Sequence, residues 1–263
     1  MAAPSYGGVA TLLFADTSSS GTYTLPLPTG TSEGDLLVAA VSMQSWTSGS
    51  VNEISSGWKV VMNRLYRPVV YYKFATAADV SAGNSGTYTK DSTFRVSASV
   101  TRWTGADSVA PFVDSDSFVQ TTAVMDCPAM TATGDQVALR VVSILDNVTD
   151  ANTIPDTGLT EVSHDDNFSG ADCSLMVGYD TSSYSSGASV PAKGWSSATS
   201  EPICASTILL NGSATHTAAT PVLESYSQFE GKGTGSTFDV PTGTSSGDLL
   251  VLAATGNVVS ASS

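Results

Sequence analysis

The sequence is poor in charged residues, and above all in basic ones. Only 10 Lys and Arg stand against 24 Asp and Glu, which gives 263 residues a formal net charge of -14. Such a charge repels phosphate groups, and no basic stripe interrupts it, so nucleic acids and anionic membranes are disfavoured as partners. No run of 18 or more apolar residues occurs, so no membrane-spanning helix is predicted.

Cysteine is equally scarce. Cys127, Cys173 and Cys204 are an odd number of residues lying far apart in the sequence. This spacing favours buried free thiols over a disulfide framework or a zinc site. The N-terminus, Met1–Gly8, lacks a basic stretch followed by a long apolar one, so we expect no export by the secretory route.

Good helix formers are also few, and no helical apolar stripe exceeds about ten residues. What the chain has instead is 41 Ser and 32 Thr, together with 23 Gly and an apolar fraction of 41%. Ser, Thr, Asn, Asp and Gly favour strands and turns, and the apolar fraction suffices for a core. The sequence therefore predicts an all-β protein.

Strand patterns recur along the chain. The clearest is Phe94–Thr101, where apolar and polar residues alternate as in a strand with one packed and one solvated face. By contrast, Leu36–Val41 and Val137–Val142 are apolar on both faces, which is typical of central strands. Further strands are predicted at Val9–Phe14, Trp58–Met62, Val69–Phe74, Ser174–Tyr179 and Ile203–Leu210. Many strands with short turns indicate an antiparallel β-sandwich or jelly roll.

The chain contains an internal repeat. Pro28–Ala40 recurs at Pro241–Ala253 without a gap, and eleven of the thirteen aligned residues are identical. Pro and Gly favour a turn, and the Asp that follows Gly can bond to nearby backbone before the apolar strand begins. A fainter copy, Gly134–Leu139, suggests the equivalent strand of a second half-module.

The repeat suggests a division of the chain. Residues 1–212 form one β-sandwich module, which the copy at Gly134 divides into two half-modules, residues 213–221 are a linker, and residues 222–263 begin a second module. That last segment is too short to fold like the first. Either the chain is truncated from a longer protein, which we favour, or the segment adds strands to a neighbouring subunit.

Four segments carry a resemblance to a known class of module: Gly34–Val41, Ser56–Trp58, Val69–Ala75 and Thr104–Asp107. Their order resembles a recurrent β-sandwich module of bacteriophage virion proteins (fibre, tail and head-decorating proteins) and of some bacterial surface proteins. The similarity covers roughly residues 8–212 and restarts at about 222. It implies that the chain is a virion protein made in the host cytoplasm. The partners it implies are other virion proteins and copies of the chain, with a host-surface glycan as a further candidate.

Few residues suggest catalysis or metal binding. His164 and His216 lie outside any nucleophile or zinc pattern, and His164 is interpreted as a loop cation. Segment 164–172, with Asp165, Asp166 and Asp172, offers oxygen ligands for calcium but lacks the spacing of an EF-hand. The other acidic pairs are Asp114 with Asp116 and Asp146 with Asp150. Solvated loop carboxylates are the favoured interpretation, so no catalytic, cofactor-binding or metal-binding residue is assigned.

Aromatic residues provide a candidate sugar-binding platform. The candidates are Trp46, Tyr71, Tyr72, Trp103, Tyr184 and Trp195. Trp46 stands in a Ser-, Thr- and Gly-rich segment and is the best exposed candidate, whereas Trp58 follows Gly57 and is predicted to anchor the core.

These observations favour a non-enzymatic virion structural protein, a capsid-decorating or fibre-like subunit that forms homo-oligomers. The alternative is a bacterial carbohydrate-binding or adhesin module. A third class, a polysaccharide-degrading enzyme, requires a cleft with paired carboxylates.

Overall fold

The computed structural model describes residues 2–14, 21–43, 53–55, 57–63, 68–90, 96–144, 153–166 and 174–213. They belong to one compact unit, Met1–Thr215. Of these residues, 68% lie in strands and 4% in a helix, which confirms the all-β prediction. The repeat copy at Pro241–Ala253, the segment 222–263 and the predicted linker beyond Ser213 lie outside the described residues.

Residues 5–104 form what we call the first sandwich. Its larger sheet has the strand order β1-β8-β3-β6-β5, and its smaller sheet has the order β2-β7-β4. In chain order the elements are β1 (Ser5–Phe14), β2 (Gly21–Pro26), β3 (Leu36–Met43), β4 (Glu53–Ile54), β5 (Lys59–Asn63), β6 (Val69–Phe74), α1 (Ala77–Ala82), β7 (Asn84–Lys90) and β8 (Val96–Thr104).

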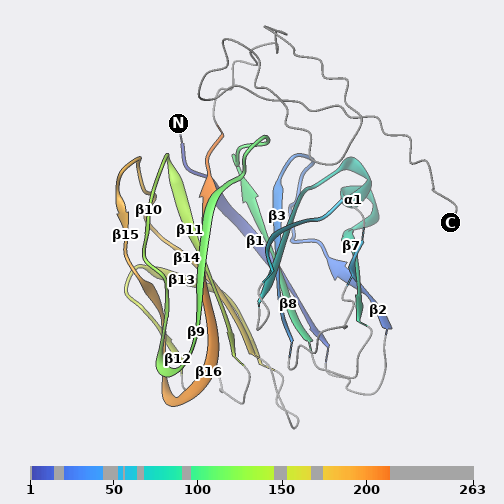
Figure 1. Cartoon of the computed structure of the whole chain (residues 1–263). Helices are drawn as coiled ribbons and strands as arrows, with labels where there is room; N and C mark the ends of the chain where they lie inside the picture. The colour runs from blue at the N-terminus through green and yellow to red at the C-terminus, as the bar shows by residue number, and fades with distance from the viewer. Residues whose placement is uncertain are drawn as a thin grey trace, which may run out of the picture. The chain divides into compact units, whose positions relative to one another are not determined.

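Residues 112–211 form the second sandwich, which lies beside the first (Figure 1). Its strands are β9 (Phe112–Cys127), β10 (Met130–Thr131), β11 (Gln136–Ile144), β12 (Thr153–Pro155), β13 (Leu159–Asp166), β14 (Ser174–Asp180), β15 (Ser189–Val190) and β16 (Lys193–Asn211). The large sheet runs β9-β16-β11-β14-β13, and the other ends of β9 and β16 pair with each other beside β12. This order repeats that of the first sandwich, strand for strand.

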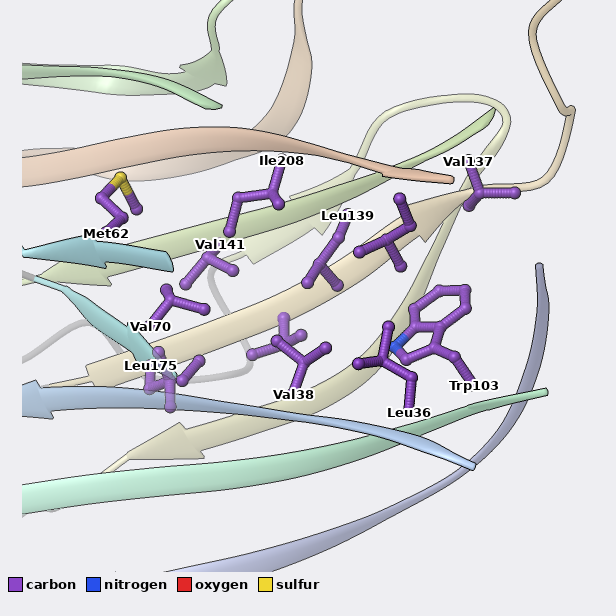
Figure 2. Close-up of a cluster of buried hydrophobic side chains, with 13 residues drawn as sticks. Leu36, Val38, Met62, Val70, Trp103, Val137, Leu139, Val141, Leu175 and Ile208 are labelled. Carbon is purple, nitrogen blue, oxygen red and sulfur yellow. The ribbon is translucent and has the colours of Figure 1, made fainter. Parts of the chain in front are cut away.

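The two large sheets face each other across a shared apolar core. Figure 2 shows side chains from β3, β6 and β8 pointing toward side chains from β11, β14 and β16. The buried members are Leu36, Val38, Ala40, Met62, Val70, Trp103, Val137, Leu139, Val141, Leu175, Val177, Ile208 and Leu210. Each sandwich also has its own outer core, so β3 and β11 are buried on both faces, as predicted.

The contacts across the shared core follow an approximate twofold axis. Ser42 of β3 and Ser143 of β11, 101 residues apart, hydrogen-bond to each other through their hydroxyl groups at 2.6 Å. Away from this pair, Tyr6 stacks on Tyr179, and the matching residue pair, Phe112 and Tyr72, also makes a ring contact. An interface in which equivalent residues exchange contacts is isologous, as in a twofold dimer. The two sandwiches therefore pack as pseudo-symmetric copies.

The turn before β11 corrects the sequence alignment of the faint copy by one residue. The Asp35 carboxylate accepts a hydrogen bond from the Ser32 N–H at 2.9 Å, and the Gln136 side chain accepts one from the Thr133 N–H at 3.0 Å. Gln136, not Asp135, is thus the counterpart of Asp35. Because a one-residue slip turns every side chain of a strand to the other face, only this register places Leu139 in the shared core.

The predicted solvated face of Phe94–Thr101 is wrong. Ser97, Ser99 and Thr101 of β8 are at most 1% exposed, because β8 lies between β1 and β3 and the second sandwich covers this face. Their small side chains allow the two large sheets to approach closely. Phe94 itself lies outside the described residues.

Candidate functional site

A cleft of about 570 Å³ opens at one end of the shared core. The first sandwich contributes the segment 2–6 and Trp103, at the start of β1 and the end of β8. The second sandwich contributes the start of β11 and the residues at and beyond the end of β14. The lining residues are Ala2, Ala3, Pro4, Ser5, Tyr6, Trp103, Asp135, Val137, Tyr179, Asp180, Thr181 and Ser183.

Three aromatic rings form one wall of this cleft. Tyr6 and Tyr179 are stacked, with ring centroids 5.0 Å apart and an angle of 25° between the rings. Trp103 meets both rings edge-on, at 5.7 Å from Tyr6 and 5.5 Å from Tyr179. Burial, reinforced by the neighbouring Tyr179, raises the pKa of Tyr6. The Tyr6 hydroxyl therefore stays protonated at neutral pH and is able to donate a hydrogen bond.

Asp180, beside these rings, is engaged by a fully buried Arg140. The guanidinium Nη2 of Arg140 lies 2.7 Å from Asp180 Oδ2, and its Nε lies 3.3 Å from Oδ1. The remaining N–H groups of Arg140 donate to Thr207 Oγ1 and to the carbonyl oxygens of Pro128 and Pro191. Since all five donors of the guanidinium are satisfied, this pair ties the loops near β10 and β15 to the large sheet.

Tyr184 completes this network. Its hydroxyl donates to Asp180 Oδ2 at 2.6 Å, and burial together with this carboxylate raises the pKa of Tyr184 to about 12. The Asp180 carboxylate thus has protein donors on both oxygens. Ser5, Asp135, Thr181 and Ser183 are the lining residues that carry further polar side chains, and three of them are exposed.

The cysteine prediction holds where the structure describes it. Cys127 and Cys204 are buried thiols that form no disulfide, and burial raises the pKa of the Cys127 thiol to about 12. A thiol with such a pKa is not ionised at neutral pH and is a poor nucleophile. Cys173 lies outside the described residues.

The interpretation of His164 as a loop cation is wrong. His164 lies in β13 with its side chain 4% exposed, and its Nδ1 is 3.2 Å from Thr153 Oγ1. It is therefore a packed strand residue. Asp165 and Asp166 also belong to β13, not to a loop.

The other acidic candidates do not converge in the part of the chain that is described. Asp114 and Asp116 both lie in β9, and the side chain of Asp116 is exposed. No group of three or more His, Cys, Asp or Glu side chains that could hold a metal ion occurs among the described residues. Asp146, Asp150, Asp172 and His216 lie outside them.

The aromatic candidates separate into core and cleft residues. Trp58 is buried and donates its indole N–H to the Ser85 carbonyl at 2.8 Å, which confirms it as a core anchor. Tyr71 and Trp195 are also buried in outer cores, Tyr72 packs on Phe112, and Tyr184 bonds to Asp180. Trp103 lines the cleft, while Trp46 lies outside the described residues.

Sequence reasoning missed Tyr6 and Tyr179 as site residues. They stand near the start of β1 and the end of β14, and only the packing of the two sandwiches brings them together. No local motif connects two such distant tyrosines. Of the three rings in this wall, the sequence had indicated Trp103, which was among the aromatic candidates.

Comparisons of the chain with protein-family models, with curated proteins and with solved structures found no match. Within the described residues, no helix is long and apolar enough to cross a membrane.

Proposed function

We propose that the chain is a non-enzymatic structural subunit of a bacteriophage particle, of the capsid-decorating or fibre-like type. The observation that carries the proposal is repetition: the chain builds one sandwich topology twice, and the sequence of Pro28–Ala40 occurs again at Pro241–Ala253. Repetition of a module adds length and contact surface without adding chemistry, which suits a structural role. The assignment to a virion rests on the resemblance of the sandwich sequence to phage modules.

The edges of the sheets provide surfaces for assembly. Val60 of β5, Val119 and Val124 of β9, and Ile154 of β12 are each more than half exposed, and all three strands lie at sheet edges. An edge strand presents unpaired backbone groups on which a second chain can add a strand. The net charge of -14 would keep unassembled copies apart in solution.

The buried polar groups support a structural role as well. Arg140 and Asp180 satisfy each other and hold loops, and the Cys127 thiol is kept protonated. A polysaccharide-degrading enzyme would need two carboxylates that act across the scissile bond, whereas of the two carboxylates that line the cleft, Asp180 is already held by Arg140 and Tyr184.

The test is to locate the protein. Antibodies against the chain, combined with quantitative mass spectrometry, would be applied to purified phage particles and to bacterial envelope fractions from the same culture. We expect the chain in intact particles at a fixed ratio to the major capsid protein. Its absence from particles together with enrichment in the envelope would contradict the proposal and favour the adhesin.

The second candidate function is glycan binding by a carbohydrate-binding or adhesin module. A separate observation favours it: the cleft with Tyr6, Trp103 and Tyr179 in its wall. This candidate does not depend on the virion role, because a fibre or decorating protein can also carry a glycan site.

A further inference from the structure

The approximate twofold axis provides an internal control for the cleft. Equivalent registers relate Tyr6 to Phe112, since each is paired with the residue at the end of the last strand, Trp103 or Leu210. In the same way Tyr179 corresponds to Tyr72, because they pair with Leu139 and Val38. The ends of β8 and β16 lie at the same end of the shared core, where Ala106 pairs with Gly212, so one scaffold builds two related sites on either side of that end.

The two related sites differ in chemistry. At the cleft the lining includes Tyr6, Trp103 and Thr181, whereas the symmetry-related positions on the other side of the shared core hold Phe112, Leu210 and Phe74. Phe112 and Phe74 pack against the shared core there, and Leu210 is buried in it. The fold is thus satisfied by purely apolar residues at these positions. The Tyr6 and Thr181 hydroxyls at the cleft therefore have no counterpart that the fold needs, whereas Trp103 is itself a fully buried core residue.

From this asymmetry we propose that the cleft binds a neutral saccharide unit, which deepens the second candidate function by naming its site and ligand class. A volume of about 570 Å³ lies within the range of small-molecule sites. Such sites combine aromatic walls with a few polar groups. The half-buried rings of Tyr6 and Tyr179 would pack on the C–H faces of a sugar ring, with the fully buried Trp103 behind them, and the Tyr6, Thr181 and Ser183 hydroxyls together with the Asp135 carboxylate would bond to its hydroxyl groups.

Charge selects among sugars. Asp135 lines the cleft, the charge of the neighbouring Asp180 is balanced by Arg140, and the whole chain carries a net charge of -14. An acidic sugar such as glucuronate, or a phosphorylated one, would enter against this field and bring a carboxylate or phosphate next to Asp135. A neutral hexose meets no such repulsion, and its hydroxyl groups donate readily to a carboxylate.

The experiment measures binding to the whole 263-residue chain by saturation-transfer NMR followed by titration. The probes are glucose, galactose, mannose, N-acetylglucosamine, maltose and lactose, with glucuronate as the anionic comparison. We expect at least one neutral sugar to bind, with glucuronate weaker than every sugar that binds.

Two variants locate the site. Thr181→Phe places at the cleft the residue type found at the symmetry-related position, Phe74, and should raise the Kd at least about tenfold. Ser183→Trp obstructs the same cleft from an exposed position, so it remains a test if the first variant does not fold. The matched control is Phe74→Thr, the reverse exchange at the symmetry-related position, which lies outside the cleft lining and should leave the Kd unchanged.

The proposal is overturned if no neutral sugar binds, if glucuronate binds best, or if both cleft variants bind like the parent. These results are independent of the location experiment: a particle protein without sugar binding would refute the site alone, and a sugar-binding protein absent from particles would refute the virion role alone.

Discussion

The first and second sandwiches share one topology but satisfy a buried charge in opposite ways. At equivalent positions on the fourth strand of each large sheet stand Lys73 of β6 and Asp180 of β14, both buried. Lys73 pairs with Asp79 of α1 at 2.7 Å, and Asp180 pairs with Arg140 of β11 at 2.7 Å. The scaffold thus accepts either sign of charge at this position, provided that a partner of opposite sign is supplied.

The two outer cores also differ in which strands carry their large side chains. In the first sandwich Trp58, Tyr71 and Tyr88 fill the core, and their counterparts in the second are Leu159, Gly178 and Trp195. A Cβ at Gly178 would lie 3.1 Å from the Trp195 ring, so the missing side chain on β14 makes room for the larger one on β16. Core volume is maintained although the residues that provide it change strands.

The largest expected difference between the sandwiches concerns the two charge pairs. Arg140→Met leaves Asp180 buried without its cation and should lower the free energy of unfolding by about 3–5 kcal/mol. Lys73→Met should cost less, because Asp79 is 13% exposed and keeps its hydrogen bonds from Thr76. Urea unfolding monitored by fluorescence measures both. Equal losses of unfolding free energy for the two variants would contradict the stated difference between the two ion pairs.

The tryptophans test whether both outer cores support the fold. Trp58→Ala and Trp195→Ala should each lower stability by about 3–5 kcal/mol, the usual result of deleting a large buried aromatic side chain. Trp46→Ala, which changes a residue predicted from sequence to be exposed, should have almost no effect. Thermal unfolding of the three variants decides the matter, and a shift for Trp46→Ala as large as that for Trp58→Ala would contradict the core assignment.

The smallest effects are the pH responses of two carboxylates. Burial alone would raise the pKa of Asp79, but hydrogen bonds from Lys73 and Thr76 and the Lys73 charge outweigh it and lower the pKa below 3.8. The pKa of Asp126 shifts in the other direction, because burial and the neighbouring Asp156 raise it. Asp79 therefore stabilises the protein above about pH 4, and this contribution is lost as the pH falls through its lowered pKa. Asp126 stabilises the protein at low pH, and its contribution is lost as the pH rises from 3.8 through its raised pKa.

Two Asn variants separate these responses. Asp79→Asn should destabilise the protein at pH 7, by less than about 1 kcal/mol, with the loss shrinking toward pH 3. Asp126→Asn should stabilise it at pH 7, and this gain should shrink on acidification. Urea unfolding at pH 3, 5 and 7 checks both signs, and parallel pH profiles for the two variants would refute the assignment.

Much of the fold could be predicted from sequence because strand patterns are local. Val69–Phe74 coincides with β6, and the doubly apolar segments became β3 and β11. The solvated face assigned to Phe94–Thr101 failed because small polar residues such as Ser97 and Ser99 are compatible with burial when another sheet covers them. Alternation of residue types indicates two faces but not what lies against each.

The candidate site was less accessible to sequence reasoning. Trp103 was among the aromatic candidates, but Tyr6 and Tyr179 come together only through the packing of one sandwich on the other. The faint copy at Gly134 indicated a second module, yet its alignment was off by one residue, because Gln136 performs the role of Asp35 with a different residue type.

The most direct test of this account is a cross-link on the approximate twofold axis. The Ser42 and Ser143 hydroxyl oxygens lie 2.6 Å apart, so the two side chains point at each other at the short range that a disulfide requires. The double variant Ser42→Cys/Ser143→Cys would be refolded under oxidising conditions, with Ser42→Cys alone as the control, and analysed by peptide mass spectrometry without reduction. We predict an intramolecular disulfide that joins the peptides of β3 and β11 in a monomeric chain. Free thiols at both positions, or disulfides only between chains, would contradict the pseudo-symmetric packing of the two sandwiches.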